Sequence, residues 1–322
     1  MLAIRSAVSI LSSAVMIMGA GVVSGQNYPN KPIRIVTGSI GGGNDTAARL
    51  IVQGISGPLG QQVIVENRAT IVTAETVAKA NPDGYTLLFA GDILWIGPLL
   101  RVKRDDLPDP VKDFSPISML ASSPNVVVVH PSSPAKSVKE LIALARAKPG
   151  QINYGTSTPG GTPHLGGEMF NTMAGVKMTG VPYKGSGDIA RALIGNEVHV
   201  GFLSAGSVAA HVQSGRLRAL AVTSLKPSAM APGLPTMAES GLPGYELVGI
   251  DAMYAPAGTP VAVINRLNRE IVRFLRTPEA KEKYLTIGGE VIGSSPQEHA
   301  AKIKSSMASM GKVIKDAGIK IK

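Results

Sequence analysis

Short apolar runs alternate with amphipathic segments along most of the chain. The runs are rich in Val, Ile and Leu, and each is short enough to form one buried strand. Between the first two runs, apolar residues recur at helical spacing, as Ala47, Leu50, Ile51 and Ile55 show. This alternation predicts the α/β class, with parallel-type sheets flanked by helices on both faces. The predicted strands are 32–37, 62–66, 85–90, 125–130, 151–156, 198–203 and 217–223.

Capping residues predict where several helices begin and end. Asn44 or Asp45 is expected to cap the first helix, and Gly57-Pro58 is expected to stop it. Further helices are predicted at 73–79 and 138–147 and in the C-terminal part, and 226–243 reads as a long connection. The other capping signals are Ser137 with Glu140, Thr259 with Pro260, and Ser295 with Pro296 and Glu298.

Two glycine-rich turns follow predicted strands, at 38–43 and 157–161. A turn of this kind exposes backbone N–H groups at the start of a helix, where the helix dipole favours an anion. A carboxylate therefore fits each turn, and two turns that face each other fit the two acid groups of a dicarboxylate. The alternative is that the glycines serve only tight turns and close packing. The polar side chains beside the turns are Ser39, Asn44, Ser157, Thr158 and Thr162.

The first 25 residues differ from the rest of the chain. Arg5 gives a basic start, an apolar run covers 7–23, and Val23-Ser24-Gly25 supplies small residues where a signal peptidase cleaves. This pattern predicts a secretory signal peptide over 1–25 and a periplasmic protein. A membrane anchor is the alternative, but the serines within the run and its marginal length disfavour it.

Composition narrows the function further. The formal net charge is +10, and an anionic solute explains it better than nucleic acid because the basic residues are dispersed without interleaved aromatics. The chain has no cysteine, which excludes disulfides and thiolate chemistry. None of its five histidines pairs at metal-ligand spacing on one helix, so we expect no metal and no cofactor.

Catalytic motifs are not found in the sequence. The string nearest to a serine-hydrolase elbow, 155–159, ends in proline where glycine is needed. The turn at 41–43 lacks the Lys and Ser/Thr of a phosphate-binding loop. These departures predict that the protein is not an enzyme.

Several strings together resemble the substrate-binding proteins of tripartite tricarboxylate transporters, often called the Bug family. The resemblance is in order and covers almost all of the chain after residue 25. It rests on 28–36 (YPNKPIRIV), 41–49 (GGGNDTAAR), 65–68 (VENR), 81–88 (NPDGYTLL), 111–116 (VKDFSP), 181–185 (VPYKG), 217–223 (LRALAVT) and 255–260 (APAGTP).

The resemblance implies a two-lobed periplasmic binding protein fold (type II-like) with two chain crossovers. Lobe 1 is expected over 26–122 and 245–322, and lobe 2 over 123–244. The resemblance also implies that the lobes close on a carboxylated solute and that the protein delivers this solute to the permease subunits of a membrane transporter. The first strand–helix loop would hold one carboxylate, and the loop 157–164 and the stretch 202–207 would contribute from lobe 2.

Candidate ligand-binding residues follow from the turns and the resemblance. Trp95 is either a core residue or a platform on which a flat ligand stacks. Tyr183 either contacts the ligand or serves only in a tight turn. The full candidate set is Ser39, Ile40, Gly41, Gly42, Asn44, Asp45, Asp92, Trp95, Ser157, Thr158, Thr162, His164, Tyr183, Ser204 and Ala205.

The sequence predicts a periplasmic receptor that captures a small carboxylate. A dicarboxylate is the preferred ligand, and an aromatic acid is the alternative. A monomer is expected, because a clamp must move freely. Two other functions stay open. One is a sensor that presents the bound acid to a membrane kinase, and the other is a serine hydrolase built around Ser157 or Ser204.

Overall fold

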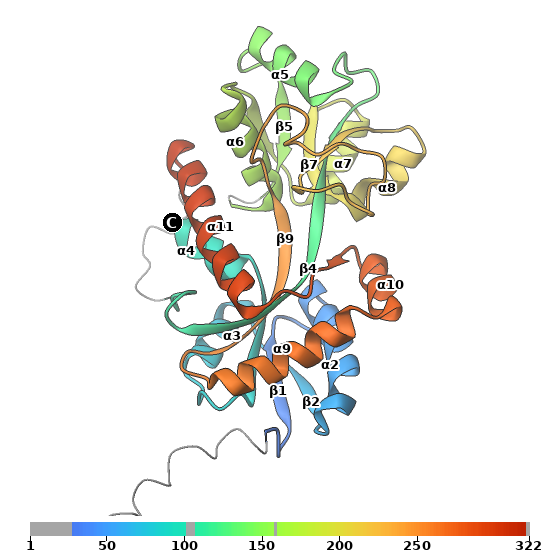
Figure 1. Ribbon diagram of the computed structural model, residues 1–322. Coiled ribbons are helices and arrows are strands. Elements are labelled where there is room, and N and C mark those ends of the chain that lie inside the picture. The colour runs from blue at the N-terminus through green and yellow to red at the C-terminus, as the bar shows by residue number, and fades with distance from the viewer. Residues whose placement is uncertain (1–27, 101–106, 158–159, 320–322) are drawn as a thin grey trace, which may run out of the picture.

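The computed structural model describes residues 28–100, 107–157 and 160–319, and it has the two-lobed α/β architecture that the sequence predicted (Figure 1). The strand order is β2-β1-β3-β9-β4-β7-β5-β6, and β8 and β10 also pair with β4. The strands are β1 (Ile33–Thr37), β2 (Val63–Asn67), β3 (Thr86–Gly91), β4 (Phe114–Val129), β5 (Asn153–Thr156), β6 (Thr179–Pro182), β7 (Val200–Ser204), β8 (Arg218–Val222), β9 (Val248–Pro256) and β10 (Glu290–Val291).

The sheet is mixed rather than wholly parallel. In lobe 1, β1 pairs in parallel with β2 and β3, and in lobe 2, β5 pairs in parallel with β6 and β7. The antiparallel pairs all involve β4 or β9, the two strands that join the lobes. Parallel pairing needs a long crossover, usually a helix, and this explains why the strand–helix alternation of the sequence identified β1, β2, β3, β5 and β7. The edge strand β6 was not predicted.

β4 is the structural link between the lobes. Residues 114–124 pair with β9, and residues 125–129 pair with β7 and β8. The predicted strand 125–130 covers only its second half. Pro116 and Pro124 in the first half argue against a strand, but the β4–β9 register shifts near Pro116, and such irregularities accommodate proline.

A buried group of hydrogen bonds around Thr223, called the clasp below, joins the two segments that cross between the lobes. It lies where β4 changes its pairing partners. The Thr223 hydroxyl donates to the carbonyl oxygen of Leu247 (2.6 Å) and accepts from the backbone N–H of Asn125 (3.0 Å). The Asn125 side-chain amide donates to the same Leu247 carbonyl (3.0 Å). The side chain of Thr223 is fully buried, and Asn125 is nearly so. The hydroxyl of one threonine therefore ties β4 to the segment that enters β9.

The helices cover both lobes. α9 and α2 lie together beside the sheet of lobe 1, and the last helix runs upward past α4 to α6 of lobe 2 (Figure 1). A single apolar cluster includes Trp95 of lobe 1, Tyr154 of lobe 2 and Ile314 of the last helix. The helices are α2 (Gly43–Leu59), α3 (Thr70–Ala78), α4 (Ile93–Leu100), α5 (Val138–Ala147), α6 (Thr162–Ala174), α7 (Ser186–Ile194), α8 (Ala205–Gln213), α9 (Val261–Leu275), α10 (Pro278–Thr286) and α11 (Pro296–Asp316).

Helix boundaries differ from the sequence prediction at α2, at α3, which spans 70–78 and not 73–79, and at α9, whose N-cap is Pro260 and not Thr259. α2 does not stop at Gly57-Pro58, because Gly60 is the residue in the left-handed conformation (φ 67°) that ends it. Its N-cap is Gly42, so neither Asn44 nor Asp45 caps it as expected. The capping box of Ser295 and Glu298 at the start of α11 is confirmed.

Candidate functional site

The glycine-rich turn of lobe 1 lies at the carboxyl end of β1, where ligands of open α/β sheets bind. Gly41 has φ 77°, a left-handed conformation that favours glycine, and Gly42 is the N-cap of α2 with no side-chain hydrogen bond. Of the predicted residues here, Ser39 is exposed and Ile40 is 80% exposed. The N–H groups of Gly41 and Gly42 donate to Asp45 and to the Ser39 carbonyl. The N–H groups of Gly43 and Asn44, in the first turn of α2, are therefore those that the helix leaves for a ligand.

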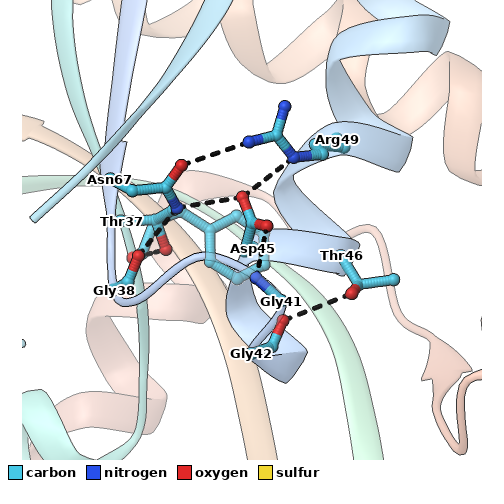
Figure 2. Close-up of polar contacts among 9 residues, drawn as sticks. Thr37, Gly38, Gly41, Gly42, Asp45, Thr46, Arg49 and Asn67 are labelled. Atoms are coloured by element: carbon cyan, nitrogen blue, oxygen red, sulfur yellow. Dashed lines mark hydrogen bonds and ion pairs between the residues drawn. The ribbon is translucent and has the colours of Figure 1, made fainter.

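Asp45 shapes this turn from within (Figure 2). Its Oδ2 accepts from the backbone N–H of Gly41 (2.9 Å). Its Oδ1 accepts from the Asn67 amide (2.9 Å) and from Arg49 Nε (2.9 Å). The Gly41 hydrogen bond is the main reason why the pKa of Asp45 falls to about 2. The sequence suggested Asp45 as a ligand contact, but both carboxylate oxygens are already used to hold the turn.

Asn67 at the end of β2 completes this arrangement. Its amide also donates to the carbonyl oxygen of Gly38 (2.8 Å), and its Oδ1 accepts from Arg49 (3.1 Å). The sequence analysis used Asn67 only as part of a family string. The structure gives it the role of fixing the backbone between β1 and α2.

The turn of lobe 2 repeats the same geometry with different chemistry. Gly160 has φ 81°, Gly161 is the N-cap of α6, and the Gly160 N–H donates to Nδ1 of His164 (3.0 Å). In both turns, a left-handed glycine thus donates to the side chain four residues later. Because Nδ1 accepts, the neutral ring carries its proton on Nε2. Burial lowers the pKa of His164 and favours this neutral form.

Four of the remaining predicted residues of lobe 2 lie at the same edge of the sheet, namely Ser157, Thr162, Ser204 and Ala205. β5 and β7 are parallel neighbours, so Ser157, the residue after β5, and Ser204, the last residue of β7, lie at neighbouring strand ends. Ser204 is exposed, Ala205 is buried at the start of α8, and Thr162 is half-buried at the start of α6. Tyr183 donates its backbone N–H to the Thr156 carbonyl (2.8 Å), but its side chain lines a separate hollow with Lys184 and Asp188. Thr158 lies outside the described residues.

A cavity of about 340 Å³ adjoins the turn of lobe 1. It is mostly polar, and two of its residues, Asp251 of β9 and Tyr284 of α10, were not predicted from the sequence. Their positions depend on segments far from the turn along the chain. The lining residues are Gly41, Gly43, Asn44, Thr46, Ser123, Asp251, Tyr284, Ile287 and Gly289.

A second cavity of about 380 Å³ lies on the other side of Asn44 and is mostly apolar. Its walls come from the ends of β1 and β3 and from α3 and α4, and they include Phe89, Ile93, Leu94 and Pro98. Asn44 lines both the polar cavity and the apolar one.

The structure places Trp95 in the core and not at a ligand surface. Its side chain is fully buried, and its ring meets His299 of α11 edge-on at 6.2 Å. Burial also lowers the pKa of His299 to about 3, so that ring is neutral. The interpretation of Trp95 as a stacking platform is therefore corrected, because α11 covers the indole ring.

Asp92 lies at the start of α4 and lines a small cavity of about 30 Å³, with Lys302 and Glu246. Burial and the neighbouring charge of Asp251 raise the pKa of Asp92 to about 7. Lys302 forms an ion pair with Glu246, with Nζ and Oε2 2.5 Å apart. The space suits about one ordered water molecule. Asp92 lines this small cavity and is not among the residues that line the cavity beside the turn.

Among the described residues, no group of His, Cys, Asp and Glu has an arrangement that would hold a metal ion. Within the same part of the chain, no helix combines the length and apolar character needed to cross a bilayer.

Comparisons with known proteins agree on one family. A family model described as the tripartite tricarboxylate transporter family receptor matches residues 47–319. Protein BugT of Bordetella pertussis is 32% identical over 307 residues, which make up 94% of this chain and 94% of that protein.

Solved structures are similar over most of the chain. An R. palustris protein solved with adipate is 35% identical, with a TM-score of 0.70, over 91% of this chain and 99% of that one. The periplasmic binding protein BugD is 30% identical, with a TM-score of 0.67, over the same shares of 91% and 99%.

Proposed function

Because the chain belongs to the family of tripartite tricarboxylate transporter receptors, we propose that it captures a small carboxylate in the periplasm and delivers it to the permease of such a transporter. The observation that carries the proposal is the pair of matched turns, one in each lobe, that leave backbone N–H groups at helix starts. The similar R. palustris protein was solved with adipate, a dicarboxylate, which supports a diacid for this chain also.

The binding mechanism we infer is closure of the two lobes on the acid. We assign residues 26–122 and 245–322 to lobe 1 and 123–244 to lobe 2. The change of partners along β4, from β9 to β7 and β8, supports this division. In the open form the acid enters, and closure brings the turn near Gly161 toward the turn near Gly42. The candidate contacts are Ser39, Ile40, Gly41, Gly42 and Asn44 from lobe 1, with Ser157, Thr158, Thr162 and Ser204 from lobe 2.

A fitting acid is expected to raise the melting temperature of the protein that starts at residue 26. A ligand at about 100 times its Kd adds about 2.7 kcal/mol to the free energy of unfolding, which corresponds to about 4–5 °C for a chain of this size. The measurement is a thermal-shift screen with succinate, glutarate, adipate, citrate, an aromatic diacid and amino acids. The diamide of adipic acid is the matched control, since it keeps the shape but has no charge. A flat response to every acid, with no acid released from the denatured protein in mass spectrometry, would contradict the proposal.

Delivery to a permease predicts a second result. A strain that lacks this chain should lose uptake of the stabilising acid, and the full-length chain should restore it. A chain without residues 1–25 should not restore it, because we propose that they form the signal that directs export. Normal uptake in the deletion strain would argue for a sensor instead.

A further inference from the structure

We propose that Glu290 of β10 is a positioning residue for lobe closure. It holds the lobes in the open arrangement, in which the two glycine-rich turns are apart, and it is released when the lobes close on a ligand. Its hydrogen bonds to residues 228–230 are called the latch below. This inference rests on the closure mechanism of the proposed function, and it concerns the equilibrium between the open and closed forms and not the identity of the acid.

The first observation is that three donors converge on one carboxylate oxygen. Oε1 of Glu290 accepts from the Ser228 hydroxyl (3.0 Å) and from the backbone N–H groups of Ala229 (2.5 Å) and Met230 (3.3 Å). The N–H of Ala231 donates to the Ser228 carbonyl (3.2 Å), which closes the turn that presents these donors. Successive backbone N–H groups of a turn form an anion-binding concavity, and hydrogen bonds to a carboxylate are stronger than those between neutral groups.

The second observation is that the two sides of the latch belong to different lobes. β10 is a strand of lobe 1, where Glu290 lies opposite Ser122 of β4 in the antiparallel register. On the other side, Met230 and Leu234 pack against the apolar cluster of lobe 2 that includes Val128. Because each side is held by the core of its own lobe, a rotation of one lobe against the other must move the carboxylate away from its donors.

The third observation is the place of the latch beside the ligand cavity. Gly289, the residue before Glu290, lines the cavity at the turn of lobe 1 together with Gly41. None of the described residues that line this cavity belongs to the turn 157–164 of lobe 2, so the two turns are apart in this arrangement. α10, which leads into β10, lies at the edge of lobe 1 nearest to lobe 2 (Figure 1). The latch is thus formed while the site is open, and it stabilises that state.

A latch on the open form weakens ligand binding without touching the ligand. When only the closed form binds tightly, the apparent Kd is the intrinsic Kd divided by the fraction of the protein that is closed. Glu290 lowers this fraction and therefore raises the apparent Kd. A receptor that has to hand its ligand to a permease gains from this effect, because the open form is also the one that releases the ligand.

The test removes the latch and measures both the shape of the protein and its affinity for acids. Native protein that starts at residue 26 is compared with Glu290→Ala by small-angle X-ray scattering without ligand. We expect the variant to have the smaller radius of gyration, since more of it is closed. Calorimetry with succinate, glutarate and adipate should give the variant a Kd about tenfold lower for each acid that binds.

Two milder variants and one control accompany Glu290→Ala. Glu290→Gln keeps the shape and one acceptor oxygen, and Ser228→Ala removes one of the three donors, so each should give a smaller effect in the same direction. These two variants decide the question if Glu290→Ala fails to fold. Glu279→Gln is the matched control, because this exposed glutamate of α10 pairs with Lys283 of its own lobe, and it should change neither the scattering nor the Kd.

The outcomes separate the latch from the proposed function. If the Glu290 variants scatter and bind like the native protein, the carboxylate follows its donors through closure and the latch is wrong. If they bind an acid more weakly, Glu290 supports the closed form, which also contradicts the proposal. If none of the acids binds to any of the proteins, the proposed capture of a diacid fails, while the scattering without ligand still decides whether Glu290 holds the lobes open.

Discussion

Replacing Asp45 with alanine should lower the free energy of unfolding by about 2–4 kcal/mol and abolish most of the thermal response to ligand. The variant removes three hydrogen bonds, leaves the Gly41 N–H without a partner and leaves the Asn67 amide with only the Gly38 carbonyl. The turn then loses the conformation that presents its free N–H groups. Chemical unfolding measures the stability, and the thermal shift with the best acid measures the binding.

Thr46→Ala is the matched control for that variant. Thr46 is the next residue, and its exposed hydroxyl makes one hydrogen bond, to the Gly42 carbonyl (3.2 Å). Its removal should cost about 0.5–1 kcal/mol. Equal losses for the two variants would show that the Asp45 carboxylate does not hold the turn.

The effect of Asp45 should also depend on pH. Its pKa is about 2 in the folded protein against an ordinary value of 3.8, so folding favours the charged form. The stabilisation is therefore complete above about pH 4 and is lost as the pH falls through 2. The difference in unfolding free energy between the native chain and Asp45→Ala should shrink over that range.

Thr223→Val should destabilise the protein by about 2–4 kcal/mol, although the two side chains have nearly the same shape. The change removes the hydroxyl that donates to Leu247 and accepts from Asn125, and it leaves buried backbone groups with fewer partners. Chemical unfolding measures the loss. Thr223→Ser keeps the hydroxyl and should lose about 1 kcal/mol, from the missing methyl group. If serine were as harmful as valine, packing and not the clasp would explain the residue.

The sequence predicted those parts of the fold that depend on local chemistry. The capping box of Ser295 and Glu298 and the helix from Val138 to Ala147 match the structure, because caps and helical periodicity involve residues a few positions apart. The first half of β4 was missed because its partner, β9, lies more than a hundred residues later and its own prolines suggest a loop. Local patterns do not record such long-range pairing.

The candidate site shows the same division. The two turns were recognisable from their glycines, but Asp251 and Tyr284 reach the first turn only through β9 and α10. For Trp95 the sequence left a core position and a ligand platform open. The helix that buries it comes about two hundred residues later and supplies His299. The roles of Asp45 and Asn67 inside the turn required atomic distances that a sequence does not contain.

The late position of α11 in the sequence also affects how the protein folds during its synthesis. It is the last helix along the sequence, yet its apolar residues belong to the cluster that includes Tyr154 in lobe 2 and Trp95 in lobe 1. A ribosome makes these residues after all the strands of both lobes, so the core shared by the lobes stays open until α11 has been made. Proteins usually fold domain by domain as they are synthesised. Here the apolar clusters around Ile35 in lobe 1 and around Val128 in lobe 2 contain no residue of α11. The core that the lobes share is therefore the part completed last.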